Sequence, residues 1–278
     1  MNNMLKNKEI KYSLLFITIV LITTWSFAFY AFSSPETVRL YFLVMLIPAI
    51  VALILNSIRY RSIRLVFRPI TTRINLKSIL FSLLYPLLFI GTAAIFVFIM
   101  GLAEFDKDKV SNLITQLPSI EMIIAGFILI FGEEYGWRGF LLKALAEAKG
   151  KVYGAIGVGV VWAVWHAPIV YGLAKFTHMK NPLLLTVVQV GAVFVFSMPF
   201  AYSYFLSKSI IPPMLFHFIW NLYNPIVLGN IYRNHPGIMI GNIIYINGEG
   251  LAGIILGLPF LIWFIAQNKN KTIGKSNR

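Results

Sequence analysis

The chain has 278 residues, of which 58% are hydrophobic and 12% are charged, and its formal net charge is +14. Soluble domains carry about a quarter charged residues, so this composition excludes an ordinary soluble fold and predicts an all-α polytopic membrane protein. The absence of cysteine excludes disulfides, cysteine nucleophiles and cysteine-based zinc sites.

Apolar runs of about 20 residues, the length that a helix needs to cross a bilayer, recur along the whole chain. They lie at 12–32, 39–58, 79–101, 119–142, 152–174, 182–206, 209–228 and 250–267. The first run follows basic residues, as in a signal peptide, but it shows no small-residue cleavage site. We therefore predict a retained first helix and about eight transmembrane helices in all.

Basic residues are concentrated in the connection between the second and third runs. It carries Arg59, Arg61, Arg64, Arg68, Arg73 and Lys77. The positive-inside rule places this connection in the cytoplasm, and alternation of the spans then places both termini there. Such a cluster can also bind nucleic acid or lipid headgroups, but topology accounts for it without a further partner. We expect a multi-pass protein of the cell membrane that contacts membrane lipid and does not bind nucleic acid.

The spans divide the chain into three parts. Residues 1–118 are expected to hold the first three helices and the basic cytoplasmic loop, and residues 229–278 an extracellular loop, the last helix and a basic tail. Residues 119–228 contain the polar groups that stand out at membrane depth. The richness in Ile, Asn and Lys is typical of a bacterium with an AT-rich genome, so we expect the bacterial plasma membrane.

The fourth run contains two adjacent carboxylates and an arginine. Glu133, Glu134 and Arg138 lie in a segment that is otherwise mostly apolar or glycine. Ionisable residues at this depth cost roughly 3 kcal/mol each by insertion scales and are usually paired and functional. Glu134 and Arg138 are four residues apart and so share a helix face as an ion pair, whereas Glu133 lies about a hundred degrees away. We predict a supporting role for the pair and a chemical role for Glu133.

The fifth and seventh runs contain further polar groups. His166 lies in the fifth run, and His217 and Asn221, one helical turn apart, lie in the seventh. Counted from the expected ends of the spans, these side chains lie at depths compatible with that of Glu133, so the four could meet in one polar chamber. A single intramembrane histidine is often only a hydrogen-bonded packing residue. The prediction of a site therefore rests on the presence of all four groups at compatible depths.

The expected entrance to this chamber lies at the cytoplasmic start of the seventh run. A hydrolase must admit water, so the polar faces of the spans have to line a cavity. His217 lies only about two turns from that start, and Pro212-Pro213 leaves the mouth without a regular helix to close it. We expect the chamber to open to the cytoplasm.

Three motifs follow one another on separate spans: Glu133-Glu134-x-x-x-Arg138, Trp162-x-x-x-His166 and His217-x-x-x-Asn221. In this order they resemble the CPBP family of intramembrane proteases, and the resemblance covers about residues 119–228. That family includes type II CAAX prenyl endopeptidases and proteins of bacteriocin immunity and lysostaphin resistance. One departure is Trp162, where the family usually has phenylalanine.

The resemblance implies an endopeptidase that hydrolyses a peptide bond in a membrane-associated peptide or protein. Glu133 and His166 would activate a water molecule, and His217 and Asn221 would bind the oxyanion. The predicted ion pair would support them from behind. Four kinds of substrate remain open: a prenylated CAAX tail, a peptide pheromone, a bacteriocin and a membrane-protein segment.

Three alternatives remain open. Glu133, His166 and His217 could bind Zn²⁺ with a position left for water, although the local HExxH signature is absent; without zinc, no cofactor is required. A secondary transporter also places ionisable residues at the midplane, but it usually shows repeated halves, which are not evident here. A non-catalytic membrane scaffold that regulates a partner is the third alternative.

Overall fold

The structure, a computed structural model, describes residues 3–111 and 118–273. Its first elements are α1 (Asn3–Ala31), α2 (Pro35–Val38), the 3-10 helix η1 (Tyr41–Leu46), α3 (Ile47–Tyr60), α4 (Ile63–Val66), α5 (Arg68–Thr71), α6 (Leu76–Ile99), β1 (Ala103–Phe105) and α7 (Lys107–Ser111). The later elements are α8 (Ile120–Glu134), the π-helix η3 (Tyr135–Leu142), α9 (Lys143–Lys149), α10 (Lys151–Phe176), α11 (Pro182–Ser207), α12 (Ile211–Leu228), β2 (Met239–Gly241), α13 (Ile243–Ile246) and α14 (Leu251–Ile273).

Within the described ranges, six helical segments are long and apolar enough to cross a membrane, which confirms the all-α polytopic membrane class. They are Asn3–Ala31, Tyr41–Tyr60, Leu76–Ile99, Lys151–Phe176, Pro182–Ser207 and Ile243–Asn268. The other two predicted spans correspond to α8 with η3 and to α12. α8 has only 15 residues before the π-helix begins, and α12 has 18. The count of eight spans therefore stays a prediction.

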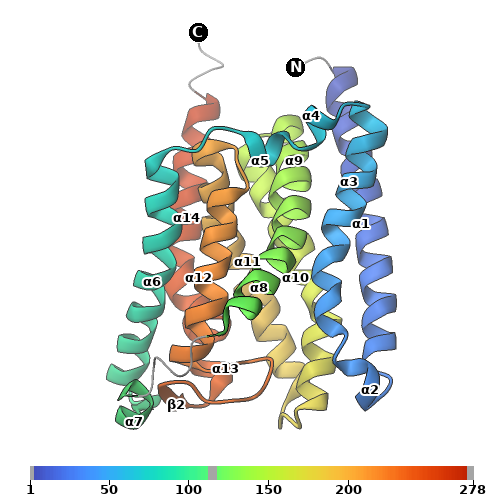
Figure 1. Ribbon diagram of the computed structural model, residues 1–278. Helices are drawn as coiled ribbons and strands as arrows, with labels where there is room; N and C mark the ends of the chain where they lie inside the picture. Colours follow the sequence, from blue (N-terminus) through green and yellow to red (C-terminus); the bar gives the residue numbers. More distant parts are fainter. Residues whose placement is uncertain (1–2, 112–117, 274–278) are drawn as a thin grey trace.

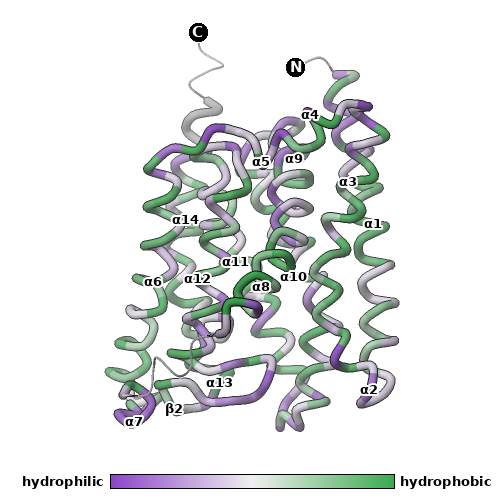
Figure 2. The backbone as a smooth tube through the Cα atoms, in the orientation of Figure 1, coloured by the Kyte–Doolittle hydropathy of each residue, from purple (hydrophilic) through white to green (hydrophobic). Residues whose placement is uncertain are grey.

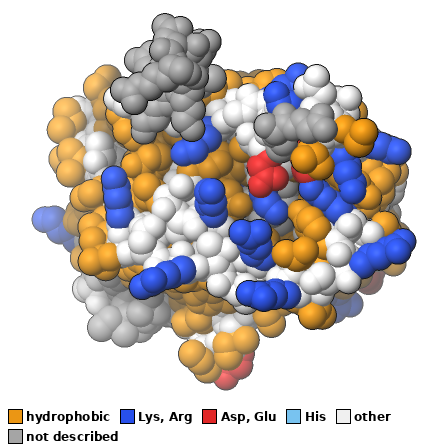
Figure 3. Space-filling view, turned by 90° about the horizontal axis from the view of Figure 1, so that it is seen from above, with side chains coloured by type: hydrophobic (Ala, Val, Ile, Leu, Met, Phe, Trp, Pro, Cys, Tyr) orange, Lys and Arg blue, Asp and Glu red, His pale blue; other side chains and the backbone are white. Residues whose placement is uncertain are grey.

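The long helices form a bundle with two different ends (Figure 1). The start of α1, α4, α5 and the end of α14 lie at one end, which we call the basic end after the connection 59–77; α2, α7, β2 and α13 lie at the other, the loop end. Hydrophilic residues gather at both ends of the largely hydrophobic bundle (Figure 2). Seen from the basic end, Lys and Arg side chains far outnumber acidic ones (Figure 3). The positive-inside rule predicts that this end is cytoplasmic.

α11 lies at the centre of the bundle and the terminal helices lie at its edge. In the apolar window of α11, 67% of the residues are buried, against 28% in α1 and in the span that includes α14. α11 packs against α10, α12 and α14. The outer helices expose large apolar side chains such as Phe29, Ile95 and Ile262. Lipid chains can cover such side chains, as the membrane class requires.

The packing of α3 against the fourth predicted span depends on small residues. α8 continues directly into the π-helix η3, a rare geometry that is frequently found at functional sites. A Cβ atom added at Gly136 would collide with Pro48 at the start of α3, and one at Gly132 would collide with the backbone of Met45. The glycines therefore let η1 and α3 approach the backbone that carries the two carboxylates.

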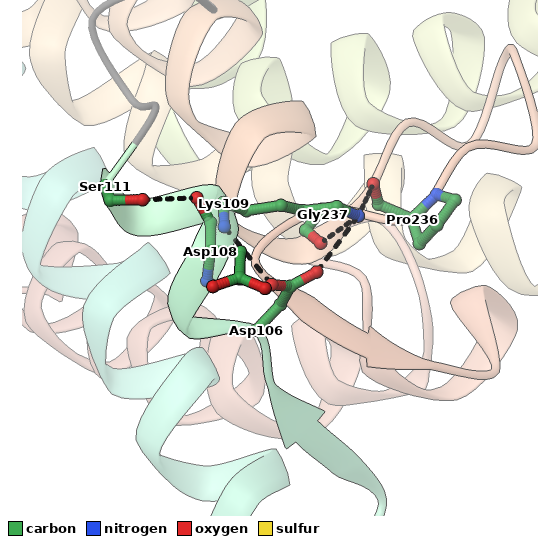
Figure 4. Close-up of polar contacts among 6 residues, drawn as sticks. All are labelled: Asp106, Asp108, Lys109, Ser111, Pro236 and Gly237. Atoms are coloured by element: carbon green, nitrogen blue, oxygen red, sulfur yellow. Dashed lines mark hydrogen bonds and ion pairs between the residues drawn. The ribbon is translucent and has the colours of Figure 1, made fainter.

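The connections at the loop end are tied together across the sequence. β1 pairs antiparallel with β2, with Ala103 opposite Gly241. In Figure 4, the Lys109 ammonium group donates to the carbonyl oxygens of Pro236 and Gly237, at 3.1 and 3.0 Å. The Asp106 carboxylate accepts the backbone N–H of Lys109 at 3.2 Å. These contacts hold the connection 229–250 against the segment that follows α6.

Candidate active site

Glu133 lies near the end of α8 with its side chain inside the protein. Only 3% of its surface is exposed. Its Oε2 accepts a hydrogen bond from the Trp162 indole Nε1–H on α10 at 2.7 Å. The structure gives Glu133 no basic partner among the described residues, which matches the expectation that this carboxylate is not held in the ion pair.

Glu134 and Arg138 form the predicted ion pair. Arg138 Nη1 donates to Glu134 Oε1 at 3.0 Å, and both side chains are completely buried. The guanidinium group packs against two adjacent aromatic rings, 4.2 Å from the centroid of Trp162 and 4.4 Å from that of Phe200. Cation–π attraction of this kind adds about 2 kcal/mol when the groups are desolvated. The pair is thus enclosed by the helices that carry the other polar residues.

His217 contacts the same carboxylate from α12. Its Nδ1 lies 2.8 Å from Glu134 Oε1. A carboxylate accepts hydrogen bonds, so Nδ1 carries the hydrogen and Nε2 is left for another partner. Glu134 therefore joins Arg138 to His217, a link that their positions in the sequence do not predict.

His166 is oriented by its own helix. Its Nδ1 lies 2.8 Å from the carbonyl oxygen of Trp162, one turn earlier in α10. Because a carbonyl oxygen can only accept, Nδ1 donates and the neutral ring has its lone pair on Nε2. The ring also packs edge-to-face against Trp165, with centroids 4.7 Å apart. The indole of Trp165 is in turn fixed by donation to Thr24 of α1 at 2.8 Å.

One cavity of about 300 Å³ brings the four predicted residues together. It is lined by Glu133, His166, His217 and Asn221, and by aromatic side chains that include Trp162, Phe196, Phe200 and Trp220. Asn221 is exposed, and its amide makes no hydrogen bond to any residue that the structure describes. The cavity thus presents a carboxylate, two histidines and a free amide within apolar walls, as ligand sites commonly do.

The entrance expected at Pro212-Pro213 is wrong. Ser209 and Ile210 are completely buried, and the Ile210 N–H donates to the Pro69 carbonyl at 2.9 Å, so α5 covers the start of α12. The cavity continues instead to side chains near the loop end: Tyr41, Phe42, Asn230, Tyr232 and Glu249. The sequence argument failed because a connection far away in the chain folds over the proline pair.

A family model described as "Type II CAAX prenyl endopeptidase Rce1-like" matches residues 115–223. This segment is therefore similar to Rce1-like proteins of the CPBP family. At the level of the family, this match supports a CAAX-type intramembrane endopeptidase. No curated protein matches the chain.

The matched segment contains all six predicted catalytic and supporting residues. It runs through α8, η3, α9, α10 and α11 and ends within α12, after Asn221. Helices α1, α3 and α6 lie outside it, as does the connection after α12 that carries Tyr232 and Glu249. The cavity is therefore built partly by segments that the family match does not reach.

The alternative zinc ligands do not form a metal site. Among residues 3–111 and 118–273, no group of three or more His, Asp or Glu side chains is placed so that it could hold a metal ion. Glu133, His166 and His217 line the same cavity, and their hydrogen bonds leave Oε1 of Glu133 and Nε2 of each histidine available. As placed here, however, the three side chains do not form a group that could hold one Zn²⁺ ion.

Two features of the site were missed by sequence reasoning. The Phe200 ring packs against the Arg138 guanidinium group, but Phe200 lies in a long apolar run and carries no local signal. Trp162 was singled out as an aromatic motif position, whereas its donation to Glu133 depends on how α8 and α10 pack. Both contacts are tertiary, so only the fold reveals them.

Proposed function

We propose that the protein is an intramembrane endopeptidase that hydrolyses a peptide bond in a membrane-associated peptide, with Glu133 as the base. The observation that carries the proposal is the single cavity lined by Glu133, His166, His217 and Asn221. Peptide hydrolysis needs an activated water molecule and a donor for the developing oxyanion, and these side chains supply both.

In this mechanism the water molecule lies between Glu133 and His166. Oε2 of Glu133 is held by Trp162, which leaves Oε1 to accept one proton of the water. Nε2 of His166 accepts a hydrogen bond from the other O–H, because Nδ1 donates to the Trp162 carbonyl. The water oxygen attacks the carbonyl carbon, and Glu133 then passes the proton to the amide nitrogen as the C–N bond breaks.

His217 and Asn221 stabilise the oxyanion. The Asn221 amide is free to donate, and His217 can donate from Nε2 once that nitrogen is protonated. Because Nδ1 of His217 already donates to Glu134, this protonation makes the ring an imidazolium, whose charge the Glu134 carboxylate balances. The second glutamate therefore positions and stabilises the oxyanion donor, while the first one activates water.

The walls of the cavity favour an apolar peptide as the substrate. Aromatic side chains contribute much of the lining, and the surrounding helices carry the peptide in the membrane phase. Maturation of a secreted or membrane-bound peptide and bacteriocin self-immunity fit this chemistry, and they do not require a prenylated CAAX tail. We propose peptide maturation as the role.

The decisive experiment compares membranes that contain the wild-type protein with membranes that contain Glu133→Gln. Peptides that depend on the protease should appear with the wild type and fall below detection with the variant, while the variant remains folded. Glu147→Gln, the same chemical change at an exposed position of α9, serves as the matched control and should cleave normally. Identical peptide sets from the wild type and Glu133→Gln would exclude Glu133 as the base and favour a non-catalytic scaffold.

A further inference from the structure

The cavity contains a second carboxylate that the proposed mechanism does not use. Glu249, at the start of the segment that leads into α14, lines the same cavity as Glu133. It lies on the connection after α12, outside the residues that match the Rce1-like family.

Three uncharged donors hold the Glu249 carboxylate. The Trp220 indole Nε1–H donates to Oε1 at 3.0 Å, and the Tyr232 hydroxyl and the Gln189 amide donate to Oε2 at 2.8 and 3.1 Å. Burial raises the pKa of the Tyr232 phenol, and the Glu249 charge raises it further, so this hydroxyl keeps its proton and donates. Both oxygens of the Glu249 carboxylate are thus held in place by these donors.

The Glu249 charge has no positive partner in the part of the chain that the structure describes. Its contacts there are hydrogen bonds to neutral groups, whereas the buried Glu134 is paired with Arg138. An unpaired charge in a partly desolvated site is costly, and a cation brought to it is strongly attracted. The rings of Trp220 and Tyr232 beside it add a surface that also favours cations.

The loop that carries Glu249 is fixed before any ligand arrives. The Asn224 side chain accepts the backbone N–H of Gly248 at 3.2 Å and donates to Asn247 Oδ1 at 3.1 Å. A Cβ atom at Gly248 would press against the Trp220 ring and the Asn224 side chain, so only glycine allows the loop to lie this close to α12. The carboxylate therefore needs little ordering when a ligand binds.

We propose that Glu249 is a subsite for a positively charged group of the substrate, either a basic side chain or a free amino terminus. Asn221 and Glu249 line the same cavity, so one extended peptide can contact both. This inference rests on the proposed endopeptidase function, since it assigns the cavity to a peptide.

Binding to a cleavage-deficient protein tests the subsite without depending on turnover. Glu133→Gln in detergent micelles would be titrated with fluorescent nine-residue peptides of Leu and Ala with blocked ends. In one series a single Lys is placed at each position in turn. In the control series norleucine, which is uncharged, replaces that Lys. A further peptide has a free amino terminus and no Lys. We expect about tenfold tighter binding with the positive charge at one place in the series.

The same titrations with Glu249→Gln added should abolish this preference, whereas Glu249→Asp, which keeps the charge, should retain part of it. Equal binding of the charged and uncharged peptides at every position would overturn the subsite, as would a preference that persists in Glu249→Gln. The peptide comparison is made on protein with Glu249 intact, so it does not depend on how the variants fold. If the wild type cut none of these peptides, the result would count against the endopeptidase function. A measured preference for the charged peptides would still support the subsite.

Discussion

Two neighbouring glutamates in this protein have different tasks because their partners differ. Glu134 is completely buried and is bonded to Arg138 and to His217, so its charge is balanced within the protein. Glu133 has one hydrogen bond, from Trp162, and faces the cavity. The paired carboxylate of Glu134 therefore supports the structure, whereas the carboxylate of Glu133 has an oxygen free to take up a proton.

Removing Arg138 should destabilise the protein more than any exposed arginine does. Arg138→Ala strands the buried Glu134 charge, and breaking a buried pair in this way costs about 3–5 kcal/mol. Thermal unfolding in detergent measures the loss, with Arg64→Ala at an exposed position as the control. Adding Glu134→Gln to Arg138→Ala should restore part of the stability, because the stranded charge is gone. Equal unfolding temperatures for Arg138→Ala and Arg64→Ala would contradict a structural role for the pair.

At the residue scale, the sequence predicts contacts within one helix and misses those between helices. The spacing of Glu134 and Arg138 was enough to predict their ion pair, which is present. The bond from His217 to Glu134 joins residues 83 positions apart, and no local periodicity encodes it. The catalytic and supporting roles of these residues stay predictions that the variants above test.

At the scale of elements, the fourth predicted span departs from a regular helix where the chemistry lies. α8 ends at Glu134 and η3 begins at Tyr135, so the π-helix starts directly after the two carboxylates. A π-helix inserts an extra residue per turn and so changes which side chains share a face. Hydropathy locates the span but gives no sign of this change, because it reports how apolar a segment is and not the hydrogen-bonding pattern of its backbone.

Gly136 should be the more sensitive of the two glycines in η3. Gly136→Ala would push a Cβ atom into Pro48, whose backbone cannot yield cheaply, and overpacking of this kind costs about 1–3 kcal/mol. Gly126→Ala, on α8, meets nothing within 4 Å and replaces glycine with a better helix former, so it should be neutral or stabilising. Unfolding temperatures of the two variants in detergent check the difference. A neutral Gly136→Ala would show that α3 does not press on η3 as described.

At the scale of the whole molecule, the basic residues gather at one end of the bundle and the cavity extends toward the other. The sequence correctly predicts an all-α membrane bundle, and basic residues gather at the end that carries α4 and α5 (Figure 3). The cavity, however, reaches toward the loop end, because α5 covers the start of α12 and the connection 229–250 supplies Tyr232 and Glu249. The span count and the division at residues 118 and 228 stay predictions, since helix length and composition alone do not establish them.

Labelling of single cysteines with a charged, impermeant thiol reagent tests this arrangement, and the chain contains no cysteine that would interfere. Arg64→Cys marks the basic end and Glu104→Cys the loop end, and both positions are exposed. We expect Arg64→Cys to react only from the cytoplasmic side and Glu104→Cys only from the outside.

Phe42→Cys, in the cavity wall, should react from the same side as Glu104→Cys, because water enters a polar cavity where its lining reaches the surface. Ser209→Cys should stay unlabelled from both sides until the protein is denatured, since Ser209 is completely buried under α5. Rapid labelling of Ser209→Cys from the side of Arg64→Cys, with Phe42→Cys protected, would instead place the entrance at the basic end.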